Sequence, residues 1–245
     1  MSHQSTFVKK LMSLEPSKTP QQKFWDLCEM AYCAYAKKTA SIEKAELLES
    51  RYMAIVSSYA DKDTVRAYPE LLALICIGLQ EGGDFLGEVA GELGALNGAQ
   101  GQFFTPYIIS RMMAEMTLGD MGPLINEKGY ITVQEPAVGA GGMVLALAEV
   151  MRRRGFDPTE QLLVTAMDVS AQCYWMAYIQ LTLAGIPAQV FCTNTLTLET
   201  FDSAWTVPAL HFLTIHGDIW AERSSKKGDT PCSDVVLSPT QLALF

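Results

Sequence analysis

A glycine-rich string follows a short strand-like run near the middle of the chain. Tyr130 to Gln134 is rich in β-forming residues, residues 135–142 read EPAVGAGG, and a helical pattern begins at Met143. Glycines at such a turn let the backbone bend sharply and leave room for a ligand at the carboxyl end of the strand, where open α/β sheets bind ligands. We therefore expect a ligand crevice there, the alternative being a tight strand-to-helix turn without a ligand.

An acidic residue follows the next strand-like run. Asp168 comes after Leu162 to Ala166, where a carboxylate can accept hydrogen bonds from a ribose diol, although it could equally cap the helix that starts at Ser170. Glu135, directly before the glycines, would repel a pyrophosphate placed at the helix N-terminus. The pattern therefore favours a ligand with positive charges, and S-adenosylmethionine, with its amino group and sulfonium, fits better than NAD.

Four strings occur in an order that resembles a known family. From about Asp84 to Leu196 the chain is similar to the adenine-N6 DNA methylases that include the methylation subunits of type I restriction-modification systems. The string GQFFTP is the most specific of the four, since no fold demands that composition. The four strings are DFLGE (84–88) with GQFFTP (101–106), EPAVGAGG (135–142), Asp168 with its following helix, and TNTL (193–196).

The resemblance implies S-adenosylmethionine as cofactor and a set of residues that hold it. Asn194 stands where the family usually has Asp, and an amide can still hydrogen-bond an adenine amino group. For Phe103 and Phe104, core packing before a Pro-initiated helix is the alternative. The implied cofactor-binding residues are Phe104, Thr105, Pro106, Glu135, Pro136, Gly139, Gly141, Asp168 and Asn194.

The catalytic motif of that family is missing. Its Asn-Pro-Pro-Tyr/Phe accepts hydrogen bonds from the target adenine and stacks on the flipped base. The nearest string here is Ser238-Pro239-Thr240-Gln241, which leaves Asn194, Ser238 and Pro239 as the catalytic candidates. We expect this chain alone to methylate DNA poorly or not at all. The alternatives are a pseudo-methylase acting as a regulatory or interaction module and, if the resemblance is accidental, an unrelated nucleotide-binding α/β protein.

The periodicity predicts an α/β fold whose sheet is preceded by an all-helical module, and the resemblance implies that this sheet is that of a Rossmann-like S-adenosylmethionine-dependent methyltransferase. We expect a flexible arm over residues 1–20, the helical module over 21–96 and the methyltransferase domain over 97–245, with a parallel sheet of βαβ units. Residues 210–215 and 234–237 are each plausible strands. Because the chain ends at Phe245, we expect either a truncated or degenerate methylase or a sheet completed differently by residues 200–245.

Composition narrows the class of protein. The 245 residues include 49% hydrophobic and 18% charged residues, with a net charge of -9, and no apolar run is long enough to span a membrane. With no secretory pattern after Met1 and six scattered cysteines that suggest reduced thiols, we expect a cytoplasmic protein without a metal site.

The expected partners follow from the resemblance. They are DNA, reached directly or through a partner subunit, and a specificity or restriction subunit, in a restriction-modification or mobile-element system. The acidic balance lowers the expectation of unaided DNA binding. Arg152 to Arg154 is read as a solvated helix end. The Met-rich helix around Arg111 to Met116 and the run Tyr174, Trp175 and Tyr178 are read as core.

Overall fold

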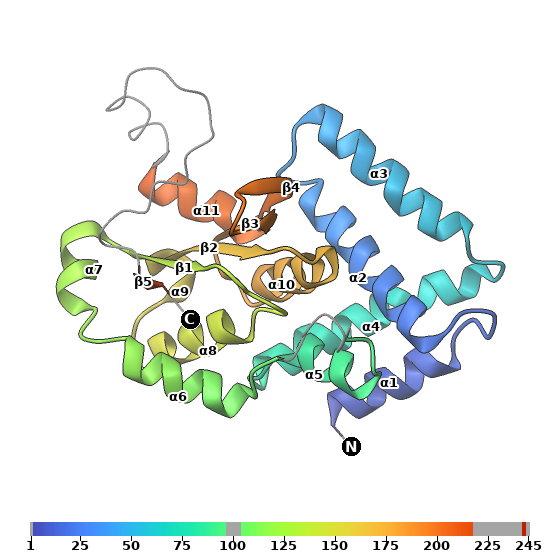
Figure 1. The fold of residues 1–245 in the computed structure, drawn as a ribbon, viewed down its shortest axis with the longest axis horizontal. Helices are drawn as coiled ribbons and strands as arrows, with labels where there is room; N and C mark the ends of the chain where they lie inside the picture. Colours follow the sequence, from blue (N-terminus) through green and yellow to red (C-terminus); the bar gives the residue numbers. More distant parts are fainter. Residues whose placement is uncertain (1, 97–103, 218–241, 244–245) are drawn as a thin grey trace.

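The computed structural model describes residues 2–96, 104–217 and 242–243 as a mixed α/β structure (Figure 1). Its sheet has the strand order β4-β3-β2-β1-β5. The strands are β1 (Ile131–Glu135), β2 (Leu162–Asp168), β3 (Ala188–Asn194), β4 (Glu199–Trp205) and β5 (Leu242–Ala243). The helices are α1 (His3–Ser13), α2 (Pro20–Ala36), α3 (Ile42–Ser57), α4 (Lys62–Gln80), α5 (Phe85–Glu92), α6 (Tyr107–Thr117), α7 (Gly122–Lys128), α8 (Gly142–Arg153), α9 (Pro158–Gln161), α10 (Ala171–Leu183) and α11 (Val207–His216).

Three neighbouring parallel strands form the middle of the sheet. β1 pairs with β2 and β2 with β3, so the carboxyl ends of all three lie at one edge. Six successive residues of β2, from Leu162 to Met167, are buried, as expected for a strand covered on both faces. Helices α8 and α10 connect these strands and lie on one side of the sheet in Figure 1. The predicted alternation of strands and helices is confirmed, and it positions the ends of β1 and β2 side by side.

One end of the sheet departs from the predicted parallel pattern and the other keeps it. β4 runs antiparallel to β3, and β5 pairs in parallel with β1. The strand expected over residues 210–215 is wrong, because these residues belong to helix α11, which has a proline in its first turn and buries Phe212. The strand expected over residues 234–237 lies outside the described residues.

The flexible arm expected over residues 1–20 is also wrong for most of its length. Ser2 caps α1 by accepting a hydrogen bond from Ser5 N–H, and the helix buries Phe7, Val8 and Leu11. These three residues lie on one face at helical spacing, so their burial stabilises a helix in a segment that looks polar overall. The ring of Phe7 meets that of Phe85 edge-on, with centroids 5.6 Å apart.

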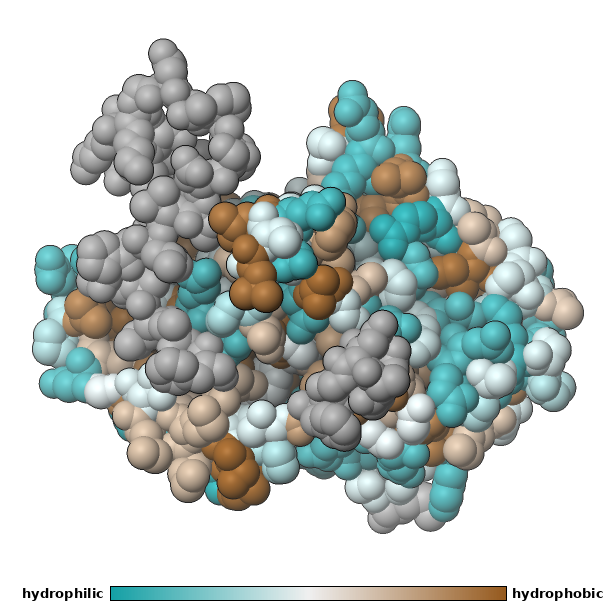
Figure 2. All heavy atoms as spheres, viewed as in Figure 1, coloured by the Kyte–Doolittle hydropathy of each residue, from teal (hydrophilic) through white to brown (hydrophobic). Residues whose placement is uncertain are grey.

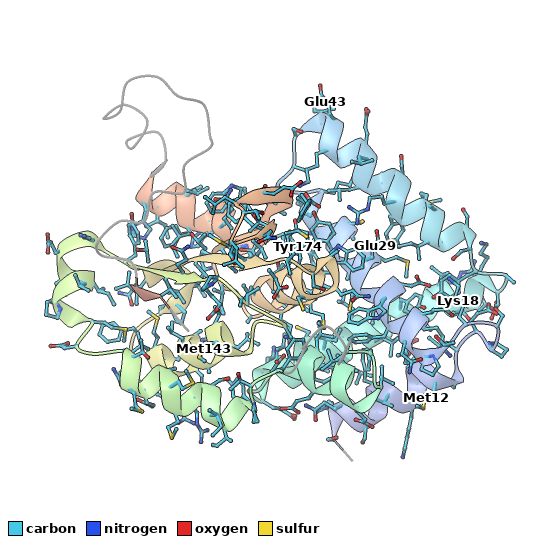
Figure 3. The ribbon with its side chains drawn as sticks, viewed as in Figure 1. Met12, Lys18, Glu29, Glu43, Met143 and Tyr174 are labelled. Carbon is cyan, nitrogen blue, oxygen red and sulfur yellow. The ribbon has the colours of Figure 1, made fainter. Side chains whose placement is uncertain are left out.

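The N-terminal helices share a core and a polar contact with the sheet domain. One hydrophobic cluster joins side chains of α1, α2, α4 and α5 to Cys173, Met176 and Ile179 of α10. Beside it, the hydroxyl oxygens of Tyr32 and Tyr174 lie 2.8 Å apart, and Tyr32 donates to Asp202 of β4 over 2.8 Å. Figure 3 shows Tyr174 of α10 facing the region of α2. The division into a module at 21–96 and a domain at 97–245 stays a prediction.

Within the described ranges, no helix combines the length and apolar character of a membrane span. In the same residues, no group of three His, Cys, Asp or Glu side chains is arranged to hold a metal ion.

Candidate functional site

The turn between β1 and α8 depends on two glycines in left-handed conformations. Gly139 has a φ of +56° and Gly141 a φ of +102°, a region that residues with a side chain rarely adopt. A Cβ on Gly139 would also lie 3.0 Å from Cε1 of Phe104. Phe104 therefore lies against the glycine loop, and the loop approaches it closely because Gly139 has no side chain. In Figure 3, Met143 marks the start of α8 just beyond this loop.

Asp168 ties the glycine loop to the end of β2. Its Oδ2 accepts a hydrogen bond from Gly139 N–H over 2.9 Å, and its Oδ1 accepts one from Ser170 N–H over 2.9 Å. Burial raises the pKa of Asp168, while the N–H groups of Ser170 and Gly139 act in the opposite direction. The helix α10 is capped by Ser170 and not by Asp168, because the Ser170 hydroxyl accepts from Cys173 N–H.

Glu135 is the last residue of β1 and its carboxyl group is only half satisfied. Its side chain is 2% exposed; Oε1 accepts from Ala137 N–H over 3.1 Å, and the buried Oε2 has no hydrogen-bond partner among the residues that the structure describes. Burial raises the pKa of Glu135 to about 7, and the nearby Asp168 adds to the effect. Because buried polar atoms nearly always find partners, this oxygen fits a ligand that donates a hydrogen bond or carries a positive charge.

Asn194 ends β3 at the same edge of the sheet. Its Oδ1 accepts hydrogen bonds from Leu196 N–H and Thr197 N–H, at 3.0 and 3.2 Å. The amide oxygen thus holds the turn into β4. An adenine amino group would need this same oxygen as its acceptor. Because the oxygen already accepts two hydrogen bonds in the turn, the amide reaches a ligand more readily through its NH₂ group. The neighbouring Leu196 and Leu198 are exposed, and Figure 2 shows hydrophobic side chains on the surface around β3 and β4.

The other predicted site residues divide into two groups. Pro136 lies in the loop, half-buried, and Thr105 and Pro106 are exposed at the start of α6. The catalytic candidates Ser238 and Pro239 lie outside the described residues, and Asn194 is the catalytic candidate that the structure describes at this edge.

A family model supplies the identification. The model described as N-6 DNA methylase matches residues 85–239, more than half of the chain. The chain belongs to the N-6 DNA methylase family. The match includes the glycine loop, Asp168, Asn194 and the Ser-Pro string at 238–239.

Solved structures and curated sequences add little to the family match. A putative class I S-adenosylmethionine-dependent methyltransferase from Listeria monocytogenes is 14% identical, with a TM-score of 0.40 over 77% of this chain and 51% of that one. A type I restriction-modification system methyltransferase subunit from Streptococcus thermophilus is 20% identical, with a TM-score of 0.41 over 76% of this chain and 41% of that one. This N-6 DNA methylase family chain thus spans about half or less of the length of these two proteins. No curated protein matches the chain.

The arginine triplet of this family member serves the structure around α8. Arg152 donates to Ala184 O, Arg153 pairs with Glu149 over 2.7 Å, and Arg154 donates to the carbonyls of Leu118 and Gly119. These contacts link the end of α8 to neighbouring segments, and the three arginines are exposed, as predicted for a solvated helix end.

The sequence analysis placed two stretches in the core, and the structure agrees with that prediction for one of them only. Tyr174 and Tyr178 are buried, as predicted. The core interpretation is wrong for Met112 and Met116, which are 54% and 78% exposed on α6. With Ile108 they share an i, i+4, i+8 spacing, which places them on one outer face of that helix.

Sequence reasoning missed Gln180, an amide with a fully buried side chain in the apolar helix α10. It also gave no role to Asp84, which is 4% exposed and lies beside the glycine loop. A strongly polar residue inside an apolar helix was the available signal, because such residues are rarely buried without a partner.

Proposed function

We propose that this chain binds S-adenosylmethionine at the carboxyl edge of β1 and β2, as part of an adenine-N6 DNA methyltransferase of a restriction-modification or mobile-element system. The observation that carries the proposal is the buried Oε2 of Glu135 at the end of β1, for which the described part of the chain offers no hydrogen-bond partner. A carboxylate there suits the cationic end of this cofactor. Family membership supports the methyltransferase class.

Three residues would each have a different role in binding S-adenosylmethionine. Glu135 would hold the positively charged end of the cofactor, and Asp168 would accept from its ribose hydroxyls while keeping Gly139 in place. Phe104, which packs against Gly139, would help shield a ligand bound at the loop from water. The bound cofactor would supply an activated methyl group next to the position where the target amine is presented.

The carboxylates also argue against anionic ligands at this loop. Glu135 and Asp168 lie within a few residues or one hydrogen bond of the glycines. A phosphate-bearing nucleotide normally takes the start of the helix after β1 in such folds, where it needs a positive potential. Carboxylates at the same place lower that potential and favour a cation.

Target recognition is proposed to require a second polypeptide. The net charge of -9 disfavours association with the phosphate backbone of DNA, and a basic partner subunit would supply the missing attraction. We propose a specificity or restriction subunit in that role and the cytoplasm as the compartment.

Isothermal titration calorimetry tests the cofactor proposal. The wild-type chain should bind S-adenosylmethionine and S-adenosylhomocysteine, and Glu135→Gln should weaken S-adenosylmethionine binding at pH 8. Glu127→Gln, a change at an exposed residue of α7, is the matched control and should bind like wild type. Absence of heat with wild-type protein at millimolar cofactor, or binding of NAD in preference to S-adenosylmethionine, would contradict the proposal.

A further inference from the structure

Gln180 of α10 connects two segments that are far from it in sequence. Its Nε2 donates to Ala140 O and to Asp84 Oδ1, each over 2.7 Å, and its Oε1 accepts from Leu86 N–H over 3.0 Å. The side chain is fully buried, so these bonds satisfy its amide. One side chain therefore joins the glycine loop to the first turn of α5.

Asp84 completes this connection from the other side. It caps α5, because its Oδ1 accepts from Gly87 N–H over 2.9 Å. A Cβ on Gly142 would lie 2.9 Å from Asp84 Oδ2, and one on Gly87 only 2.1 Å from the same atom. The carboxyl group thus fills space that two glycines leave open, between the start of α5 and the start of α8.

The loop is held at two successive residues, Gly139 and Ala140, by two different elements. Asp168, at the end of β2, accepts from Gly139 N–H, and Gln180, in α10, donates to Ala140 O. Glycine-rich segments lose much conformational freedom when they are ordered, so a loop with positive φ at 139 and 141 needs such restraints. The Gln180 restraint depends in turn on Asp84 and Leu86, which belong to the N-terminal helices.

We infer that Gln180 and Asp84 are positioning residues that hold the glycine loop in its ligand-binding conformation and make the affinity of the site depend on the docking of α5. The inference rests on the proposed function for the identity of the ligand, S-adenosylmethionine. A buried amide–carboxyl pair is an expensive way to fill a core, because apolar side chains of similar volume would pack there without desolvating a charge. The hydrogen bond from this pair to the glycine loop accounts for its presence in the core.

Two readouts separate this role from simple core packing. Hydrogen exchange of the loop amides at 138–143, followed by mass spectrometry on the ligand-free chain, reports the loop itself, and calorimetric titration with S-adenosylmethionine reports the affinity. Gln180→Leu removes all three bonds with little change in volume, and Asp84→Ala removes the partner at α5. Both should raise loop exchange at least tenfold and weaken cofactor binding at least tenfold.

A conservative variant and a matched control complete the test. Asp84→Asn keeps an oxygen that can accept from Gly87 and Gln180, so it should restore loop exchange and affinity to within about twofold of wild type. Ile179→Ala, at the buried neighbour of Gln180, lowers overall stability without removing a bond to the loop, and should leave loop exchange close to wild type.

The outcomes distinguish failure of the inference from failure of the proposed function. If Gln180→Leu and Asp84→Ala leave loop exchange at the wild-type level, or if Ile179→Ala raises it equally, the positioning role is overturned whatever binds. If wild-type protein binds no S-adenosylmethionine, the proposed function and the dependence of affinity on α5 both fall. Faster loop exchange in both variants with tenfold weaker binding supports the inference.

Discussion

The N–H of Gly139 donates to Oδ2 of Asp168 over 2.9 Å, so the residue predicted to hold a ribose also holds the glycine loop. This bond crosses from the end of β2 to the turn after β1. Asp168 therefore has two roles, to hold the glycine loop and to hold a ribose. Point mutations can separate them, because an amide can accept the bond from Gly139 but carries no charge.

Replacement of Asp168 should therefore have graded effects. Asp168→Ala removes the acceptors of two part-buried N–H groups, those of Gly139 and Ser170, which should cost about 1–3 kcal/mol in stability and weaken S-adenosylmethionine binding by a similar free energy. Asp168→Asn keeps one of the two acceptor oxygens, so it should lose less stability than Asp168→Ala and part of the affinity. Urea unfolding and calorimetric titration of both variants measure the two effects, and equal losses in both variants would show that charge alone matters.

Gly139 should tolerate no side chain. Gly139→Ala places a Cβ where φ is +56° and where Cε1 of Phe104 would be 3.0 Å away, so we expect a loss of at least about 1 kcal/mol in stability and a weaker cofactor site. Gly91→Ala is the matched control, because Gly91 lies in helix α5 and a Cβ there would meet no other atom within 4 Å. That change should stabilise the chain by roughly 0.4–1 kcal/mol. Equal melting temperatures for the two variants would contradict this reading of the loop.

Glu135 should make stability depend on pH. Its pKa is raised from 4.5 to about 7 because the folded chain favours the neutral acid. The contribution of Glu135 to the free energy of unfolding is fully present below the pKa of the unfolded chain, near 4.5. It is lost as the pH rises through the folded-state pKa of about 7. At pH 8 the ionised carboxylate should cost up to about 3 kcal/mol, from roughly 1.4 kcal/mol per pKa unit. Glu135→Gln should therefore be more stable than wild type at pH 8 and similar to it near pH 4.5, as urea unfolding at both pH values would show.

The same carboxyl group should make cofactor binding depend on pH. A cation next to Glu135 favours the ionised form, so the affinity of wild type for S-adenosylmethionine should rise from pH 6 to pH 8. In Glu135→Gln this rise should be absent. Titrations in buffers of different ionisation enthalpy would also detect proton release on binding near pH 7. If the affinity of wild type did not change with pH, Glu135 would not contact the cofactor.

The central strands and the loop could be predicted from the sequence because their signals are local. β1, β2 and β3 are short apolar or β-branched runs, each bounded by polar, glycine or proline residues. The run from Leu210 to Ile215 is equally apolar but belongs to α11, because a short apolar run fits either a strand or a buried helix until its neighbours are known. β4 is a polar antiparallel edge strand, whose first residues are exposed and show little hydrophobic pattern.

Contacts between residues far apart in the sequence limited how much of the site could be predicted. The partners of Gln180 at Leu86 and Asp84 lie 94 and 96 residues away along the chain, and no spacing rule connects them. By contrast, Glu135, Gly139 and Asp168 follow from their positions at strand ends, where parallel strands bring chemistry together.

Methyl transfer to DNA by this chain alone should be weak or absent. Correct placement of the target amine against the methyl donor can be worth about 7–11 kcal/mol of the barrier, and the string Ser238-Pro239-Thr240-Gln241 lacks the amide acceptor and the aromatic face that provide it. Incubation with tritiated S-adenosylmethionine and mixed-sequence duplex DNA should give no label on adenine above the blank. A chain carrying Ser238→Asn, Thr240→Pro and Gln241→Tyr should give more label than wild type if the cofactor site is intact, because these changes restore the acceptor and the stacking surface. Robust labelling by wild type that is lost in Ser238→Ala would show that a serine hydroxyl can replace the amide in this fold.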